Sequence, residues 1–208
     1  STNWSLNRNK VLELGEDIDF WRIANRNNYA HMYAYEGSSL TSMYGRRYKR
    51  APEGSYAVDA SGKVIDVSGQ IIYGINGAPI INSEIEYIGD CAPKWRGGFG
   101  TTFKWKGLKA SIKFDGKYGG HVWSETNWVM NYRGKGIATL EGREGGFVPE
   151  GVMQMPDGNY KICDYVHTSS TIKTYYQIKY ARECTEANFV ETSFLKLREV
   201  RIEYSFPK

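Results

Sequence analysis

Apolar and polar side chains alternate along one stretch of the chain more regularly than anywhere else in the sequence. The apolar residues fall in one series of alternate positions on either side of a short corner: Phe99, Phe103, Trp105, Leu108, Ala110, Ile112 and Phe114. Most positions between them are polar or basic, and the corner is Lys106-Gly107, a pair suited to a two-residue turn. The pattern predicts a β-hairpin of residues 96–105 and 108–118 with one apolar and one basic face.

Four other segments show a less regular period of two and are predicted strands: 4–14, 40–49, 172–180 and 193–206. In the last of them, Leu195 and Leu197 alternate in the opposite phase to Val200 and the apolar residues after it. One extra residue in a strand reverses the phase of its side chains. We therefore expect a β-bulge or a change of the exposed face near Arg198-Glu199.

Long glycine-rich segments separate the predicted strands. Residues 50–94 and 122–170 contain many turn-forming pairs, such as Ser61-Gly62 and Asn76-Gly77, and we expect them to be loops. Connections of this length are uncommon in compact domains and are usually functional where they occur. The chain is therefore predicted to be all-β and antiparallel. Short turns at one end and long loops at the other are typical of a transmembrane β-barrel with extracellular loops.

The composition narrows the possible functions. The chain has 208 residues, the size of one domain, and no apolar run near the ~20 residues of a membrane-spanning helix. Its net charge of +4 comes from dispersed lysines and arginines, which argues against nucleic-acid binding. No arrangement of nucleophile, histidine and carboxylate suggests catalysis, so we expect no enzyme activity, catalytic residue or cofactor. The three histidines, His31, His121 and His167, are expected to be solvated loop residues.

The three cysteines lie far apart and form no Cys-x-x-Cys pair, so no metal site is expected. Cys163 and Cys184 are the only plausible disulfide pair, because both fall in a segment expected at the outer surface, where oxidation is possible. Cys91 is then left over. Three free thiols are the open alternative.

Two long segments resemble SusC-like TonB-dependent transporters. Residues 88–99, which begin Ile-Gly-Asp-Cys-Ala-Pro-Lys-Trp and end Gly-Gly-Phe, resemble the family stretch IGDPNPKWTGGF, with Cys91-Ala92 in place of its usual Pro-Asn. Residues 193–208, from Ser-Phe-Leu-Lys-Leu-Arg-Glu-Val to Tyr-Ser-Phe-Pro-Lys, resemble the family stretch SFLKLREVxLxYSLPK. Shorter landmarks at 44–48 and 143–146 follow the family order. The resemblance thus covers the chain from about residue 40 to the end.

The resemblance implies that residues 1–208 are a portion of the β-barrel domain of such a transporter, from its C-terminal half. The chain would form a partial barrel wall and would contain no plug. The family imports oligosaccharides, or less often peptides, across the outer membrane of Bacteroidetes-type bacteria. The implied partners are a SusD-like surface lipoprotein that caps the barrel, TonB acting through the plug, the remaining barrel segments and outer-membrane lipid.

Five aromatic residues lie in the long segments where no strand period explains them: Trp123, Trp128, Tyr132, Tyr160 and Tyr165. Exposed loop aromatics can stack on sugar rings or anchor a partner, so these are the candidate contacts with ligand or lid, and packing within the loop is the alternative. If the Lys106-Gly107 turn is periplasmic, residues 50–94 and 122–192 are extracellular.

A soluble extracellular β-sandwich that binds glycans is the alternative function. It would share the alternating strands and the loop aromatics. The barrel and sandwich hypotheses predict different surroundings for the apolar face that contains Phe103, Trp105 and Leu108. A sandwich would bury this face, and a barrel would present it to lipid or detergent.

Overall fold

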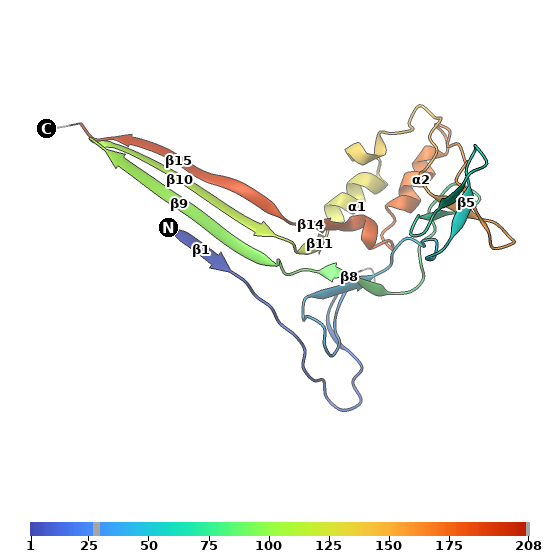
Figure 1. Cartoon of the computed structure of the whole chain (residues 1–208), viewed down its shortest axis with the longest axis horizontal. Helices are drawn as coiled ribbons and strands as arrows, with labels where there is room; N and C mark the ends of the chain where they lie inside the picture. The colour runs from blue at the N-terminus through green and yellow to red at the C-terminus, as the bar shows by residue number, and fades with distance from the viewer. Residues whose placement is uncertain (27–29, 207–208) are drawn as a thin grey trace.

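A computed structural model describes residues 1–26 and 30–206 of the chain. Strands hold 42% of the residues and helices 11%, and most strand pairs are antiparallel, so the predicted all-β class is confirmed. The molecule is elongated: a four-stranded sheet, the projecting sheet, extends from a folded head (Figure 1). The projecting sheet consists of β1, β9, β10 and β15, and the head contains the remaining elements. Pro207 and Lys208, which end the second family-like segment, lie outside the described residues.

The centre of the projecting sheet is the predicted hairpin. Strand β9 (Trp95–Trp105) pairs with β10 (Leu108–Tyr118) from Trp105↔Leu108 to Trp95↔Tyr118. Both corner residues have positive φ, 41° at Lys106 and 85° at Gly107, as a type I′ turn requires. A Cβ on Gly107 would also approach the carbonyl oxygen of Ser205 to 2.7 Å. The hairpin prediction is therefore confirmed, including its two-residue turn.

The outer strands are β1 (Thr2–Ser5), which pairs with β9, and β15 (Phe194–Tyr204), which pairs with β10 from Leu108 to Lys117. The register of β15 shifts where Lys113↔Glu199 is followed by Phe114↔Leu197, so Arg198 is the extra residue. The bulge returns Leu197 to the same face as Val200, which confirms the predicted bulge and explains the change of phase.

A second four-stranded sheet lies in the head, next to the projecting sheet. Its order is β2 (Trp21–Arg26), β3 (Ala30–Ala34), β4 (Ser42–Gly45) and β8 (Glu86–Asp90). Of the strand predicted over 40–49, only β4 forms as a continuous strand. Of the strand predicted over 4–14, only the first residues form β1. Val11 is instead fixed by backbone hydrogen bonds to the loop at Gly37 and Ser38, both 2.9 Å long.

The segments predicted to be long loops are largely folded. They contribute a five-stranded sheet of short strands, in the order β6 (Val64–Asp66), β5 (Tyr56–Val58), β13 (Tyr160–Ile162), β12 (Val152–Gln154) and β7 (Ile72–Tyr73). Parallel pairs β12–β7 and β13–β5 join the two segments, which lie far apart in sequence. Val67, Ile72 and Val152 are fully buried in the resulting core.

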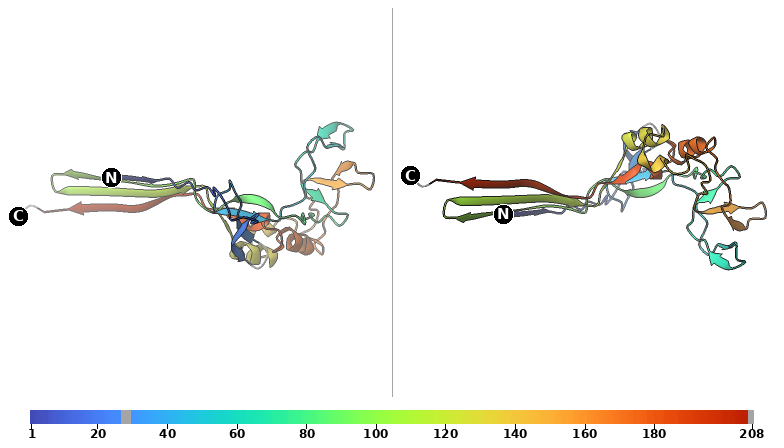
Figure 2. Two further views of the ribbon diagram at one scale, coloured as in Figure 1. Left: turned by 90° about the horizontal axis from the view of Figure 1, so that it is seen from below. Right: turned by 90° about the horizontal axis from the view of Figure 1, so that it is seen from above.

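Two short helices lie in the head, away from the tip of the projecting sheet (Figure 2). One of them shares a core cluster with β7 and β12, the other packs against it, and a two-stranded sheet completes the head. The helices are α1 (Glu125–Tyr132) and α2 (Ile172–Lys179), and the strands are β11 (His121–Trp123) and β14 (Phe189–Glu191). Within the described chain, no helix is long and apolar enough to cross a membrane.

The strand predicted over 172–180 is wrong, because this segment forms helix α2. Its buried residues are Ile172, Tyr175 and Tyr176, at the i, i+3 and i+4 spacing of one helix face. They pack with Tyr73, Met153 and Cys163 in a separate core cluster. The alternating Ile and Tyr residues satisfied a strand pattern over a few positions, but contacts in the tertiary structure favour the helix.

Candidate functional site

One face of the projecting sheet is apolar over its whole length, yet it is exposed. The pairing places on this face the large apolar residues Trp4, Trp95, Phe99, Phe103, Trp105, Leu108, Ile112, Phe114, Tyr118, Leu195, Leu197, Val200, Ile202 and Tyr204. Phe103 is 62% exposed, Ile202 73% and Leu195 77%. Soluble monomers rarely expose a continuous apolar patch of such extent, so this face is suited to an apolar environment or to a partner.

The apolar face has aromatic side chains at both ends. At the base, near the head, the Trp95 ring stacks on Trp4 at 4.6 Å and on Tyr118 at 6.3 Å between centroids. At the tip, Trp105 and Tyr204 lie on either side of the turn, and Tyr204 packs edge-to-face with Phe206 at 5.0 Å. Branched aliphatic residues such as Ile112 and Val200 lie between the two aromatic groups, together with the phenylalanines Phe99, Phe103 and Phe114.

The length of the sheet matches this division. A strand of 11 residues, the length of β9, β10 and β15, extends about 37 Å at ~3.4 Å per residue. Tilted by ~45°, it would span roughly 26 Å, close to the ~25 Å apolar band of an outer-membrane strand. Aromatic girdles at both edges of such a band are typical of membrane barrels.

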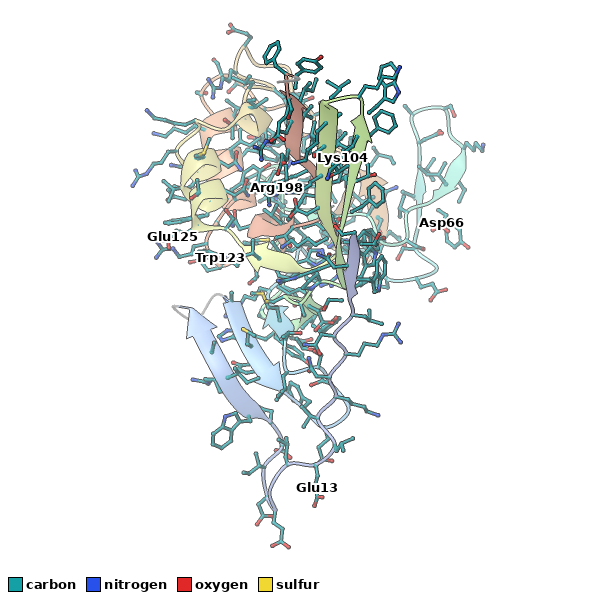
Figure 3. The ribbon with its side chains drawn as sticks, turned by 90° about the vertical axis from the view of Figure 1, so that its left-hand side faces the viewer. Glu13, Asp66, Lys104, Trp123, Glu125 and Arg198 are labelled. Carbon is teal, nitrogen blue, oxygen red and sulfur yellow. The ribbon has the colours of Figure 1, made fainter. Side chains whose placement is uncertain are left out.

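The opposite face of the projecting sheet is polar but is not simply basic. Lysines of β10 form ion pairs across the sheet with glutamates of β15: Lys109 with Glu203 at 3.1 Å and Lys113 with Glu199 at 2.7 Å. The bulge residue Arg198 forms a third pair, with Asp115. Figure 3 shows Lys104 and Arg198 on the sheet. Strand β15 therefore neutralises Lys109 and Lys113 of the basic face that the sequence predicts.

The outer edge of β15 has no paired strand among residues 1–26 and 30–206. Its backbone N–H and C=O groups along this edge are available to another strand over the full 11 residues. β15 thus offers a long edge on which a sheet could continue.

Three of the five predicted contact residues lie close together in the chain at helix α1. Trp123 ends β11, and Ser124 then caps the helix by accepting a 3.1 Å hydrogen bond from the Asn127 backbone. Trp128 and Tyr132 follow one helical turn apart, with ring centroids 5.9 Å from each other. All three side chains are half-buried. The structure therefore brings Trp128 and Tyr132 together, with Trp123 at the start of the same element.

The two tryptophans offer little to a ligand in this arrangement. The guanidinium of Arg182 covers the ring of Trp128 at 3.8 Å, and Arg182 also lies 3.7 Å from the Glu125 carboxylate. The indole Nε1 atoms of Trp123 and Trp128 are buried and have no hydrogen-bond acceptor within the described chain. Figure 3 shows Trp123 and Glu125 at this end of α1. Among the three aromatics, Tyr132 is therefore the better placed for ligand contact.

The other two predicted contact residues belong to the second part of the head. Tyr160 lies in β13 and packs against the core of the five-stranded sheet. Tyr165 packs edge-on against His167, with centroids 4.8 Å apart, beside the core cluster of α2. For these two residues the packing alternative describes what the structure shows.

Two cavities of the head contain groups that could bind a ligand. A cavity of about 980 Å³ lies where the projecting sheet meets the head, lined by Trp95, Tyr118, Tyr87 and Asp90 among others. The Tyr87 hydroxyl donates a 2.8 Å hydrogen bond to Asp90, and burial together with this carboxylate raises the pKa of Tyr87 to about 12. A smaller cavity of about 260 Å³ lies between α1 and α2 and is lined by Tyr132 and three cationic side chains.

Sequence reasoning missed the three cations of the smaller cavity, which are Arg133, Arg143 and Lys173. They lie up to 40 positions apart, and only the packing of α1 against α2 brings them together. Arg143 was singled out only as part of a family landmark. The one feature of the sequence that could have indicated this cationic cavity is the position of Arg133 directly after the predicted contact residue Tyr132.

The predicted disulfide is wrong, because all three cysteines are free thiols in the structure. Cys163 is buried in the core cluster of α2, and Cys184 is buried next to Tyr48. Burial raises the pKa of Cys184 to about 11 and also raises the pKa of Cys163. Both side chains therefore act as small apolar core residues.

We expect alkylation to distinguish the cysteines. At pH 7.5 Cys91 should react slowly with N-ethylmaleimide, because burial raises its pKa but leaves the residue partly exposed. The fully buried Cys163 and Cys184 should react only after denaturation. Intact mass and peptide mapping measure this. The C91S variant should lose the reaction of the folded protein, and a peptide linking Cys163 to Cys184 would contradict the assignment.

Two of the three histidines are buried, which corrects the expectation of solvated loop residues. His31 is 4% exposed and His167 is 1% exposed. His167 Nε2 lies 3.0 Å from the Gly77 carbonyl oxygen, and its Nδ1 lies 3.3 Å from the Thr171 hydroxyl, so the ring joins two loops of the head. His121 stacks on Phe189 at 4.7 Å. In the described parts of the chain, no three His, Cys, Asp or Glu side chains are grouped to hold a metal ion.

The geometry thus presents an exposed apolar sheet face with aromatic ends, an open strand edge and a head that contains a cationic cavity. Comparison of the sequence with profiles of known protein families finds no match, and comparison with curated proteins finds none either.

Proposed function

We propose that the projecting sheet is a transmembrane portion of an outer-membrane β-barrel wall. In this proposal its apolar face contacts lipid and its polar face lines the barrel interior. The exposed apolar face with an aromatic group at each end carries the proposal. In water this face would expose many large side chains, at a cost of ~1.5–3 kcal/mol for each one left unburied.

The protein would act as a transporter component. As the resemblance to SusC-like transporters implies, the assembled barrel would import oligosaccharides, or less often peptides, with TonB acting through a plug. The remaining barrel segments would pair with the edges of the projecting sheet. The head would lie on the extracellular side and contact ligand and a SusD-like lipoprotein. The Lys106-Gly107 turn at the opposite end would face the periplasm.

The open edge of β15 supports this assembly. A strand edge of 11 residues within a membrane would leave its backbone groups without water or partners, which is too costly in hydrocarbon. Pairing with a further strand satisfies these groups. The ion pairs of the polar face would then lie against the wet interior, where charged side chains are tolerated.

The soluble glycan-binding sandwich fits the structure less well. A sandwich requires a second sheet packed about 10 Å from the apolar face. Phe103 and Trp105 are 62% and 59% exposed in the described structure, so that face is not packed on a sheet of this chain. The sandwich would need its second layer from another molecule.

A lipid-soluble probe tests the proposal. We expect a photoactivated carbene reagent dissolved in the membranes of cells that produce the protein to label the apolar face, because only groups within hydrocarbon meet it. Label should appear at alternate positions of 95–118 and 194–204, for example at Phe103 and Ile112 but not at Lys104. Peptide mass spectrometry measures the pattern.

The head supplies a matched control for this experiment. Its peptide 56–66 contains the exposed apolar residues Tyr56, Val58 and Val64, which the proposal places outside the membrane. This peptide should stay unlabelled. Equal labelling of 56–66 and the projecting sheet, or an unlabelled sheet, would contradict a transmembrane position and favour the soluble module.

A further inference from the structure

The smaller cavity of the head is lined by three cations and by no carboxylate. It lies between the end of α1, the loop that follows the 3₁₀ helix η1 (Ile137–Thr139) and the first turn of α2. The cations are Arg133, Arg143 and Lys173. None of the three forms an ion pair with another described residue. Their charges are therefore available to a ligand.

The arginine at the cavity wall is held in a fixed orientation. Arg143 Nε donates to the Thr139 carbonyl oxygen at 2.8 Å, and its Nη2 donates to the Thr139 hydroxyl at 3.1 Å and to the Gly134 carbonyl oxygen. Thr139 is 1% exposed and is itself bonded to the Gly136 carbonyl oxygen at 2.7 Å. A guanidinium fixed in this way loses little freedom when it binds an anion.

The other two cations come from facing helix ends. Arg133 directly follows α1, with its guanidinium 5.8 Å from the centre of the Tyr132 ring, and Lys173 is the second residue of α2. The positive dipole end of α2 faces the negative dipole end of α1, so the charge of the cavity comes from the three cationic side chains. A concave surface with charges of one sign concentrates the opposite charge.

The acidic groups nearby do not cancel this charge. Tyr176 lines the cavity, and burial is the main cause that raises its pKa. The nearby Glu141 carboxylate raises the pKa of Tyr176 further, while Arg143 lowers it. The Tyr176 hydroxyl donates to the Glu141 carbonyl oxygen at 3.0 Å, but Glu141 does not line the cavity. The lining therefore carries three positive charges together with the aromatic and hydroxyl groups of Tyr132 and Ser169.

We propose that this cavity binds the oxyanion of an acidic sugar, a carboxylate or a sulfate, so that the preferred ligand is a negatively charged oligosaccharide. A volume of about 260 Å³ admits one such sugar unit, with the anion at the two arginines and Lys173 and the ring near Tyr132. The sugar part of this inference rests on the proposed function, whereas anion binding rests on the cavity alone.

Binding measurements on the protein in detergent micelles test the inference. The probes are a glucuronate-terminated disaccharide, the corresponding glucose-terminated disaccharide and inorganic sulfate. Titration calorimetry at low salt measures the affinity of the protein for each probe. We expect the acidic disaccharide to bind at least tenfold more tightly than the neutral one. R133Q and K173Q should each weaken its binding by about tenfold, which corresponds to the loss of one charged contact.

Lys135 provides the matched control. It is exposed two positions after Arg133 and does not line the cavity, so K135Q should change the affinity less than twofold. Equal binding of both disaccharides, equal effects of K135Q and R133Q, or binding of sulfate without the acidic disaccharide would overturn the inference. If the acidic disaccharide binds as expected while carbene labelling of the sheet fails, the membrane proposal is wrong and the acidic-sugar site stands.

Discussion

Replacement of Ile112 with arginine is expected to destabilise the folded protein in a lipid bilayer by about 2–4 kcal/mol. Ile112 lies in the middle of β10, opposite Thr101 of β9 and Val200 of β15, on the apolar face. If that face contacts lipid, this row lies near the bilayer midplane, where a charged side chain is most costly. Equilibrium unfolding from vesicles by denaturant, wild type against I112R, measures the change.

The loss of stability depends on the depth of the substituted residue in the bilayer and on the face of the sheet. Substitutions at another depth and on the other face therefore serve as controls. F103R, two residues from the tip of β9, should cost less than I112R, because the cost falls toward the interface. T102R, on the polar face of the same strand, exchanges an exposed side chain and one hydrogen bond to Ser111, so it should stay within about 1.5 kcal/mol of wild type. If I112R and T102R have equal effects, the apolar face does not contact hydrocarbon.

The hairpin at the centre of the projecting sheet was predictable from sequence because its order is local, whereas the pairing of β1 with β9 and of β15 with β10 joins distant segments and was not predicted. Each strand alternates along its own length, and the hairpin turn needs only the two residues at its corner, Lys106 and Gly107, both with positive φ. The bulge at Arg198 was also predictable, because the alternation of apolar and polar residues reverses its phase between Leu197 and Val200. A pattern with a period of two predicts each strand, but it identifies the partner only where the two strands are adjacent in sequence, as β9 and β10 are.

The head was not predictable in the same way because its order is non-local. Strands of two or three residues, such as β7 and β12, are too short to show a period, and their parallel pairing joins segments about 80 residues apart. The glycines that suggested loops occupy the tight turns of a folded core. Gly77, for example, has φ of 69° and packs against the rings of Tyr165 and His167.

In the candidate site too, the features that are local in sequence were predictable and those that depend on tertiary packing were not. Trp128 and Tyr132 were predicted from clustering in sequence, and they do contact each other on α1. That clustering could not reveal that Arg182, from beyond α2, covers the Trp128 ring. Nor could it reveal that Lys173 lines the same cavity as Arg133. When tertiary packing brings distant residues together, a single sequence does not show that they are close in space.

Replacement of Ile72 with alanine is expected to destabilise the head by about 2–5 kcal/mol, because the side chain is fully buried and leaves a cavity between Val67 and Val152. Ile75, three residues on, is 91% exposed, so I75A should change stability by less than about 0.5 kcal/mol. Hydrogen exchange measured peptide by peptide would report the loss: protection should fall in 56–73 and 152–163 and remain in 95–118, since the sheet shares no side chain with this core. If I72A and I75A exchanged alike, residues 50–94 would be the loop predicted from the sequence and would not belong to a folded core.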